Sequence, residues 1–265
     1  MKVKSPSREE WIDILNKCPD ATFFATPEWA EVVEKTYGYK NSTKLFVMEN
    51  GERILLPLLN IGTDYGIFNQ QLSVPFHNYG GFISERPIGT NTMLSIIKKL
   101  RWNKDNYTLC FHPFVDNKDF DVVNFTHLLN LEKGYDYISQ HLYEATCRNK
   151  IRKGEKSNIK LKIAESEGEV NKYFAVYSDS LQRWGRTDGY SLNFYLNLFK
   201  YSPEKVQIWI AEYEGNVIAG VVNVVFNKYL YNMFSAVMKE YMNLGVVNLL
   251  HDRAVKWACD KKISF

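Results

Sequence analysis

The sequence lacks the motifs that assign a chain at once to a common enzyme class. Its 265 residues contain no phosphate-binding P-loop, dinucleotide fingerprint, zinc-ligand spacing or Ser-His-Asp order of a known hydrolase. The four cysteines lie far apart and form no CxxC pair: Cys18, Cys110, Cys147 and Cys259. We therefore expect reduced thiols, with neither a disulfide framework nor a metal site.

The sequence also lacks a large excess of charge of one sign and any long apolar run. Lys and Arg number 33 against 30 Asp and Glu, a formal net charge of +3. This balance argues against a dedicated nucleic-acid coat but leaves a local anion site open. No stretch approaches the roughly twenty apolar residues of a membrane span, and the first residues lack the apolar segment of a signal peptide. We predict a cytoplasmic protein without a membrane span, and the sequence leaves its oligomeric state open.

The chain does contain enough hydrophobic residues for a packed core. They make up 45% of the sequence, and the aromatic residues among them make up 15%. In the first half, helices are predicted after Ser7, from Thr26 to Tyr37, and from Thr90 to Leu100. The Ser7 and Glu10 pair has capping-box spacing, and Pro27 suits a first helical position. Strands are predicted around the Glu49-Asn50-Gly51 turn, over 68–74 and from Thr108 onward.

The second half repeats this order of helices followed by antiparallel strands. Helices are predicted over 174–184 and 192–200, and strands over 207–212, 217–226 and 229–237. The last helix carries Leu244, Val247, Leu250, Ala254 and Trp257 on one face. We predict an α/β (α+β) fold of two tandem domains, 1–145 and 146–265, with mixed, mainly antiparallel sheets flanked by helices.

Five stretches in this order resemble a known family. They are ATFFATPEWAEVVEKTYGYK, VPFHNYGGF, CRNKIRKGEKSNIKLKI, YSDSLQRWG and the final strand–strand–strand–helix segment. Together they are similar to the Fem-type (FemABX-like) branch of the GNAT acyltransferase superfamily, which includes BioF2-like acetyltransferase-domain proteins. The resemblance implies two GNAT-like domains and an acyltransferase that uses acyl-CoA or aminoacyl-tRNA as its donor.

Residues Asn243, Leu244 and Gly245 precede the last helix and are the predicted donor-binding loop. Backbone N–H groups at a helix N-terminus suit a pyrophosphate or another anion. A full GNAT pyrophosphate loop resembles Arg/Gln-x-x-Gly-x-Gly/Ala, with two small residues, whereas this chain has one glycine there. That departure weakens the expectation of simple acetyl-CoA binding and favours an aminoacyl-tRNA donor.

Two further groups of residues are candidates for binding the acceptor substrate. Arg148 and Arg152 share a helix face with Lys153 nearby, a pattern that suits either phosphate binding or a solvated surface. Arg183 and Trp184 end a helix at Gly185, where they either cap the helix or project into an acceptor groove.

Aromatic and imidazole side chains complete the candidate set. His77 and Tyr79 flank a Gly80-Gly81 pair that forms either a ligand-facing loop or a plain turn, and Tyr231 lies on a central strand. The remaining histidines are read as structural or surface residues: His112, His127, His141 and His251. No catalytic base is assigned, although Glu212, Asp179 and Asp188 are candidates.

Two functions follow from these observations. The first is transfer of an acyl or aminoacyl group to an amine of a sugar or peptide, in a cell-envelope or polysaccharide precursor, with tRNA as a partner if it carries the donor. The second is a non-catalytic binding module that keeps the fold. The sequence ends in what resembles the start of a strand, so the chain is expected to be either naturally short or truncated.

Overall fold

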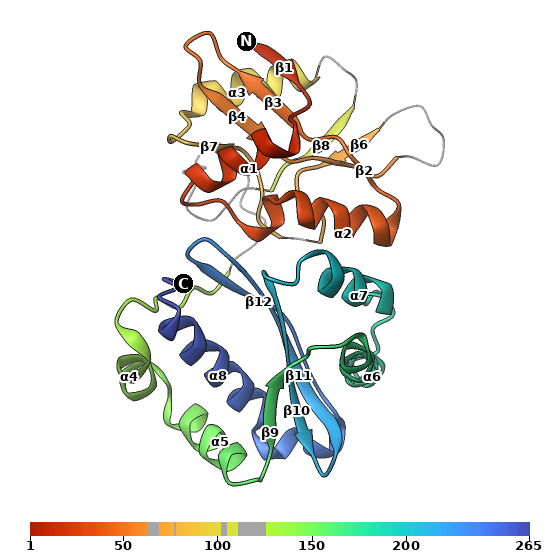
Figure 1. Ribbon diagram of the computed structural model, residues 1–265, viewed down its shortest axis with the longest axis vertical. Helices are drawn as coiled ribbons and strands as arrows, with labels where there is room; N and C mark the ends of the chain where they lie inside the picture. Colours follow the sequence, from red (N-terminus) through yellow and green to blue (C-terminus); the bar gives the residue numbers. More distant parts are fainter. Residues whose placement is uncertain (63–68, 77, 102–104, 111–125) are drawn as a thin grey trace. The chain divides into compact units, whose positions relative to one another are not determined.

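The computed structural model describes residues 1–62, 69–76, 78–101, 105–110 and 126–265. The chain forms two compact units, Met1–His127 and Leu128–Phe265 (Figure 1). The expected domain boundary at 145/146 falls inside the second unit. The division comes earlier because the helices between 134 and 142 pack on the last helix of the chain.

In its described residues, the first unit combines short strands with three α-helices. Its elements are β1 (Lys2–Lys4), α1 (Arg8–Lys17), η1 (Phe23–Ala25), α2 (Pro27–Tyr37), β2 (Lys40–Asn41), β3 (Lys44–Val47), β4 (Arg53–Leu56), β5 (Leu59–Asn60), β6 (Gln70–Leu72), β7 (Ile83–Ser84), α3 (Thr90–Arg101) and β8 (Asn106–Thr108). Its described strands form an antiparallel sheet, β1-β3-β4-β7, and a mixed sheet, β2-β5-β6-β8, in which β6 and β8 are parallel.

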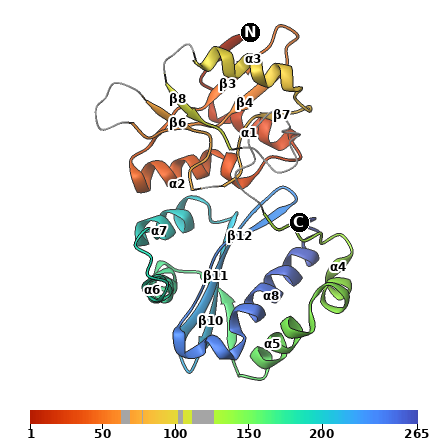
Figure 2. The ribbon, with the colours of Figure 1, turned by 180° about the vertical axis from the view of Figure 1, so that it is seen from behind.

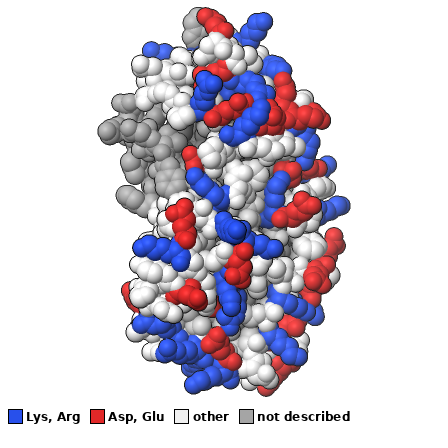
Figure 3. Space-filling view, turned by 60° about the vertical axis from the view of Figure 1, so that its left-hand side comes forward, with Lys and Arg blue, Asp and Glu red and all other residues white. Residues whose placement is uncertain are grey.

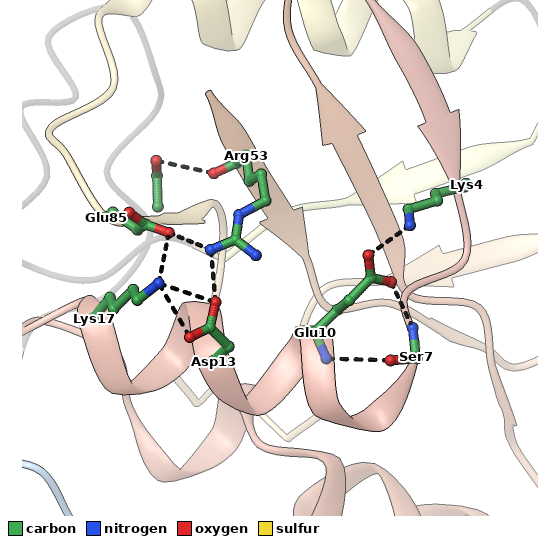
Figure 4. A network of polar contacts seen from close by, with 8 residues as sticks. Lys4, Ser7, Glu10, Asp13, Lys17, Arg53 and Glu85 are labelled. Atoms are coloured by element: carbon green, nitrogen blue, oxygen red, sulfur yellow. Dashed lines mark hydrogen bonds and ion pairs between the residues drawn. The ribbon is translucent and has the colours of Figure 1, made fainter. Parts of the chain in front are cut away.

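The first two α-helices have the N-terminal caps that the sequence predicts. Ser7 and Glu10 make a reciprocal capping box on α1, and the Thr26 side chain accepts a hydrogen bond from Trp29 N–H at the start of α2. Figure 4 shows Arg53 of β4 reaching Asp13 of α1, at 2.6 Å, and Glu85 just after β7. These ion pairs join α1 to the antiparallel sheet.

The second unit is a four-stranded antiparallel sheet between two layers of helices. Its elements are α4 (Gly134–Tyr137), the π-helical segment η2 (Ile138–Leu142), α5 (Ala145–Glu155), β9 (Lys160–Ile163), α6 (Glu167–Arg183), α7 (Leu192–Tyr201), β10 (Val206–Tyr213), β11 (Asn216–Phe226), β12 (Tyr229–Val237), η3 (Lys239–Leu244) and α8 (Val246–Asp260). The strand order is β12-β11-β10-β9. Figures 1 and 2 show α6 and α7 on one face, with α8, α5 and α4 on the other.

Each face of this sheet has its own core. On the α6 and α7 side, aromatic rings meet edge to face or at an angle: Tyr173, Tyr177, Phe194, Tyr195 and Phe234. On the α8 side, Val246 and Leu250 pack against Ala219 and Val221 of β11. The mixed, mainly antiparallel fold expected from the sequence is confirmed.

One helix starts earlier than predicted. The sequence analysis places it at Phe174, whereas α6 begins at Glu167. The Ser166 side chain caps it by accepting a hydrogen bond from Glu169 N–H. Ser166 and Glu169 have the same capping spacing that identified α1, so this signal was present in the sequence.

Gly220 allows α6 to approach the sheet closely, which leads to a stability prediction. A Cβ at this position would lie 2.5 Å from the Tyr173 ring and 2.8 Å from the Trp209 carbonyl oxygen. We expect Gly220→Ala to lower the free energy of unfolding by about 1–3 kcal/mol, the usual penalty of overpacking. Urea unfolding followed by circular dichroism measures this loss.

Gly168→Ala is the matched control. Gly168 lies in α6, where an added Cβ would be no closer than 3.8 Å to its nearest neighbour. Alanine is the better helix former, so this variant should unfold at the parent's urea concentration or a higher one. Equal stability of the parent and Gly220→Ala would contradict the close packing of α6 on β11.

Candidate active site

The candidate site lies along β12, which is an edge strand of the second unit's sheet within the described residues. Near one end of the strand, Leu230 N–H donates to the Phe265 carbonyl at 2.7 Å. At the other end, the backbone of Val237 points away from β11 and toward α6. Val237 N–H donates to Ser180 Oγ at 3.3 Å, and its carbonyl accepts from Ser180 Oγ at 3.1 Å.

Arg183 completes this contact between α6 and β12. Its Nη2 donates to the Val237 carbonyl at 3.0 Å and to Ser180 Oγ at 3.2 Å, while Nη1 donates to Asp179 at 2.8 Å. The guanidinium therefore holds the strand in place. The sequence predicts that Arg183 either caps its helix or projects into an acceptor groove. In the structure, its described contacts join α6 to β12.

The backbone of Ser235 faces the open edge of the strand. In an antiparallel pair, outward-facing residues recur at every second position. Val237 faces outward and Met238 N–H bonds inward to Ile218, so Ser235, paired with Val221, also faces outward. The Ser235 N–H therefore points away from β11. This donor is available to a group that lies along the edge.

A β-bulge next to Ser235 changes the direction of the strand's side chains. The register with β11 shifts so that Val222 pairs with Phe234 and Asn223 pairs with Asn232, which leaves Met233 as the extra residue. A bulge at a sheet edge re-aims side chains and interrupts pairing.

A pocket of about 440 Å³ and one of about 230 Å³ lie in this unit, and the smaller one adjoins the bulge. The smaller pocket is lined by Tyr177, Leu181, Trp184, Arg186, Asp188, Tyr190, Met233, Phe234 and Ser235. Trp184 is 50% exposed, so its indole is available to a ligand. Arg186 binds Asp188 through two hydrogen bonds of 2.9 and 3.0 Å.

Polar side chains connect Ser235 to the interior. Ser235 Oγ lies 2.9 Å from His251 Nε2 of α8 and donates to Asn232 Oδ1 at 3.2 Å. Asn232 Nδ2 in turn donates to Asn223 Oδ1 at 3.0 Å, and Asn223 is fully buried. Burial lowers the pKa of His251 below its ordinary value of 6.5, so its imidazole is neutral at pH 7.

His251 is predicted from the sequence to be a structural or surface residue, and Asn223 and Asn232 are not among the predicted site residues. A signal for His251 was present in the helical spacing. It lies four residues after Val247 and three before Ala254, on the face predicted to be apolar. Its contact with Ser235 depends on the packing of α8 against β12, which spacing along the chain does not give.

The candidate carboxylates are all ion-paired. Asp179 binds Arg183, and Glu212 of β10 binds Lys162 at 2.9 Å. Asp188 lines the pocket, where its hydrogen bond with Arg186 holds the pKa of the carboxyl below its usual value. A carboxylate held by a guanidinium is a weaker base than a free one.

The predicted donor loop immediately precedes α8. Gly245 caps the helix in a left-handed conformation with φ of 74°, and no side chain caps the helix in its place. A Cβ on Gly245 would lie 2.2 Å from the Lys150 carbonyl oxygen, so α5 packs directly against this turn. Asn243 is exposed, whereas Leu244 packs into the core beneath α8.

The basic segment forms α5, and its two central arginines differ in their contacts. Arg148 Nη1 donates to the carbonyls of Tyr143 and Gln140 at the end of η2. Arg152 and Lys153 are exposed in the last turn of α5. Arg148 and Arg152 both line the larger pocket, of about 440 Å³, together with the buried Asp252.

Three other predicted site residues lie elsewhere. His77 is outside the described residues, and Tyr79 belongs to the first unit, where its carbonyl accepts a hydrogen bond from Thr22. Gly80 permits close packing on Val74, since a Cβ would lie 2.0 Å from that side chain. Tyr231 pairs with Val224 near the start of β12.

Surface charge and metal ligands complete the description. Figure 3 shows Lys and Arg side chains interspersed with Asp and Glu on the face that it displays. Among the residues that the structure describes, no group of three or more His, Cys, Asp or Glu could hold a metal ion. In the same residues, no helix has the length and apolar character that crossing a bilayer requires.

Comparison with known proteins identifies the domain that contains this site. Residues 143–265 match the acetyltransferase (GNAT) domain. No curated protein matches the sequence. The fold of the chain is similar to that of FemX, with a TM-score of 0.76 and 11% identity over 100% of this chain and 87% of FemX.

Lysylphosphatidylglycerol synthetases share the fold. L-PGS from Bacillus licheniformis has a TM-score of 0.59 at 12% identity, covering 98% of this chain and 75% of that one. A putative lysylphosphatidylglycerol synthetase domain from Agrobacterium fabrum gives 0.58 at 11%, over 97% and 78%. These likenesses confirm the predicted fold. The match over residues 143–265 supports the predicted GNAT-like domain in the second half of the chain.

The contacts of Arg148 lead to a prediction that separates it from Arg152. Arg148→Ala removes a charged donor from the carbonyls at the end of η2. We expect it to lower the free energy of unfolding by about 1–2 kcal/mol, as the loss of such a hydrogen bond does. Arg152→Ala should change it by less than about 0.5 kcal/mol, as exposed substitutions do. Urea unfolding of both variants measures the difference. Equal changes in the free energy of unfolding would contradict a stabilising contact between Arg148 and the end of η2.

Proposed function

We propose that this chain, whose residues 143–265 match the GNAT domain, transfers an acyl or aminoacyl group to an amine of a sugar or peptide. The donor is acyl-CoA or aminoacyl-tRNA. The observation that carries this proposal is the open edge of β12 between two anchored positions, Leu230 and Val237. A donor of either kind presents a carbonyl group that can lie along such an edge.

The outward N–H of Ser235 is the group that would polarise the donor carbonyl. Aminolysis of a thioester or ester builds negative charge on the carbonyl oxygen as the amine attacks. A fixed backbone N–H aimed at that oxygen stabilises the charge, and such a donor commonly contributes about 10²–10³-fold in rate. The bulge at Met233 leaves this part of the edge accessible.

The pocket beside the bulge would hold the acceptor. Trp184 offers an exposed aromatic surface, and Arg186 and Asp188 present one charge of each sign. An amino sugar or a peptide combines an apolar face with polar groups and fits this lining. Ser235 also lines this pocket, so an amine held there would lie beside the donor carbonyl.

The start of α8 supports a donor that carries phosphate groups. Its first turn has no side-chain cap, so the positive end of the helix dipole is available to an anion. The single glycine of this loop supports aminoacyl-tRNA over acetyl-CoA. On the face that Figure 3 displays, by contrast, Lys and Arg are interspersed with Asp and Glu, which favours tRNA binding less. A cell-envelope acceptor and a cytoplasmic location stay predictions.

The first test measures the donor directly. The full chain is incubated with acetyl-CoA or with charged tRNA, together with glucosamine or alanyl peptides as acceptors. We expect an amide product with one donor class, detected by mass spectrometry. If neither donor binds in calorimetry and no amide forms with either, the non-catalytic binding module becomes the better description.

A second test concerns the acceptor pocket. We expect Trp184→Ala to raise KM for the acceptor about tenfold, equivalent to about 1.4 kcal/mol, because exposed aromatic anchors often contribute this much to binding. The free energy of unfolding should change little, since the Trp184 side chain is 50% exposed.

Leu142→Ala is the control for the acceptor pocket. Leu142 is 48% exposed at the end of η2 and does not line the smaller pocket. Its KM should equal that of the parent. An unchanged KM in Trp184→Ala would remove this pocket from the acceptor site.

A further inference from the structure

We infer that Arg183 is a positioning residue that couples the acceptor pocket to the edge of β12. The inference rests on the proposed function and deepens it by naming the residue that links the bound acceptor to the strand facing the donor. Arg183 Nη2 donates to the Val237 carbonyl at 3.0 Å, and Arg183 Cζ lies 5.9 Å from the centre of the Trp184 ring. Because Trp184 lines the smaller pocket, one guanidinium contacts both the strand edge and a wall of that pocket.

The contacts of Arg183 differ from those of an ordinary helix cap. An arginine that caps a helix binds backbone carbonyls in the last turn of its own helix. The described partners of Arg183 are the Asp179 carboxylate, the Ser180 hydroxyl and the Val237 carbonyl. The one backbone group among them belongs to β12. Arg183 therefore ties the end of α6 to the strand.

Direct binding of a substrate by Arg183 fits the structure less well. The Arg183 side chain is 18% exposed, and each terminal nitrogen has a protein partner, Asp179 for Nη1 and Val237 for Nη2. The carboxylate that lines the pocket, Asp188, is held by two hydrogen bonds from Arg186 and does not compete for Arg183. Arg183 therefore acts through the groups that it holds.

A buried serine joins the same two places. Ser180 is fully buried, and its hydroxyl bonds both the N–H and the carbonyl of Val237. Its backbone carbonyl accepts a hydrogen bond from Trp184 N–H at 3.0 Å. Packed and hydrogen-bonded groups of this kind carry coupling between sites. The pocket wall and the strand edge thus share Ser180 as well as Arg183.

The position of Val237 matters because of its neighbour on the open edge. Ser235 and Val237 are successive outward-facing residues of β12. Without its contacts to α6, the end of the strand would move and the Ser235 N–H would move with it. A misplacement of about 1 Å at a reacting group can cost about 100-fold in rate. An acceptor stacked on Trp184 would stabilise the anchored strand, so the donor carbonyl is held when an amine is present to attack.

The first experiment needs no substrate. Backbone amide exchange of residues 234–238 is measured by mass spectrometry on the full chain, for the parent and for Arg183→Ala. We expect this segment to exchange about tenfold faster in the variant, while β10 keeps the parent's rate, because local opening depends on local contacts. Lys172→Ala is the control, since Lys172 is an exposed cation on the same helix, and it should leave the segment unchanged. Equal exchange in the parent and Arg183→Ala overturns the inference.

The second experiment is a double-mutant cycle with the donor and amine that give turnover. Arg183→Ala should lower kcat about 10–100-fold, because the Ser235 N–H is no longer held in place. Trp184→Ala acts mainly on KM for the acceptor. If Arg183 couples the two places, the double variant should lose less kcat/KM than the product of the two single losses. Losses that multiply to within about twofold show independent residues and overturn the coupling.

A further variant covers a failure of Arg183→Ala to fold. Arg183→Lys keeps the charge, but its single nitrogen cannot replace a guanidinium fork that holds Asp179 and Val237 on separate nitrogens. Residues 234–238 should still exchange faster than in the parent, and an unchanged rate overturns the inference. Unchanged exchange or independent losses leave the proposed function standing, whereas absence of turnover by the parent with every donor and amine overturns both.

Discussion

The attachment of β12 to α6 is the interaction on which the candidate site depends. Ser180 is fully buried and satisfies both the N–H and the carbonyl of Val237, and Arg183 adds a charge-assisted hydrogen bond to the same carbonyl. An edge strand normally presents a row of backbone groups that can pair with another chain. Here the side chains of α6 occupy the end of that row, so the opening is confined to the residues around Ser235.

Packing on both sides of the sheet keeps this attachment in place. Gly220 of β11 lets Tyr173 of α6 lie against the sheet, which brings Ser180 of the same helix within reach of β12. On the opposite face, Gly154 lets α5 approach Leu249 of α8 closely. The two faces meet at β12, where Phe234 contributes to one core and Ser235 contacts α8.

Much of this architecture could be read from the sequence, because its signals are local. The turns at Gly215 and Asn227, both with positive φ, delimit β10, β11 and β12 within a residue of their predicted bounds. The capping residues Ser7 and Thr26 mark two helices. The candidate site was harder to predict because its contacts are not local. The pairing of Ser235 with His251 requires a strand and a helix to pack, and no spacing rule encodes that distance.

The arginines also show what sequence spacing cannot predict, namely which group each guanidinium binds. Sequence spacing identifies Arg148 and Arg152 as phosphate-binding candidates, because a guanidinium fork suits phosphate, and Arg183 as a helix cap or a residue of the acceptor groove. The same fork suits backbone carbonyls, and Arg148 and Arg183 are used in that way, at the end of η2 and on β12. An arginine committed to a carbonyl has fewer donors left for a ligand. Recognition of a phosphate-bearing donor would therefore fall more heavily on Arg152 and on the uncapped start of α8.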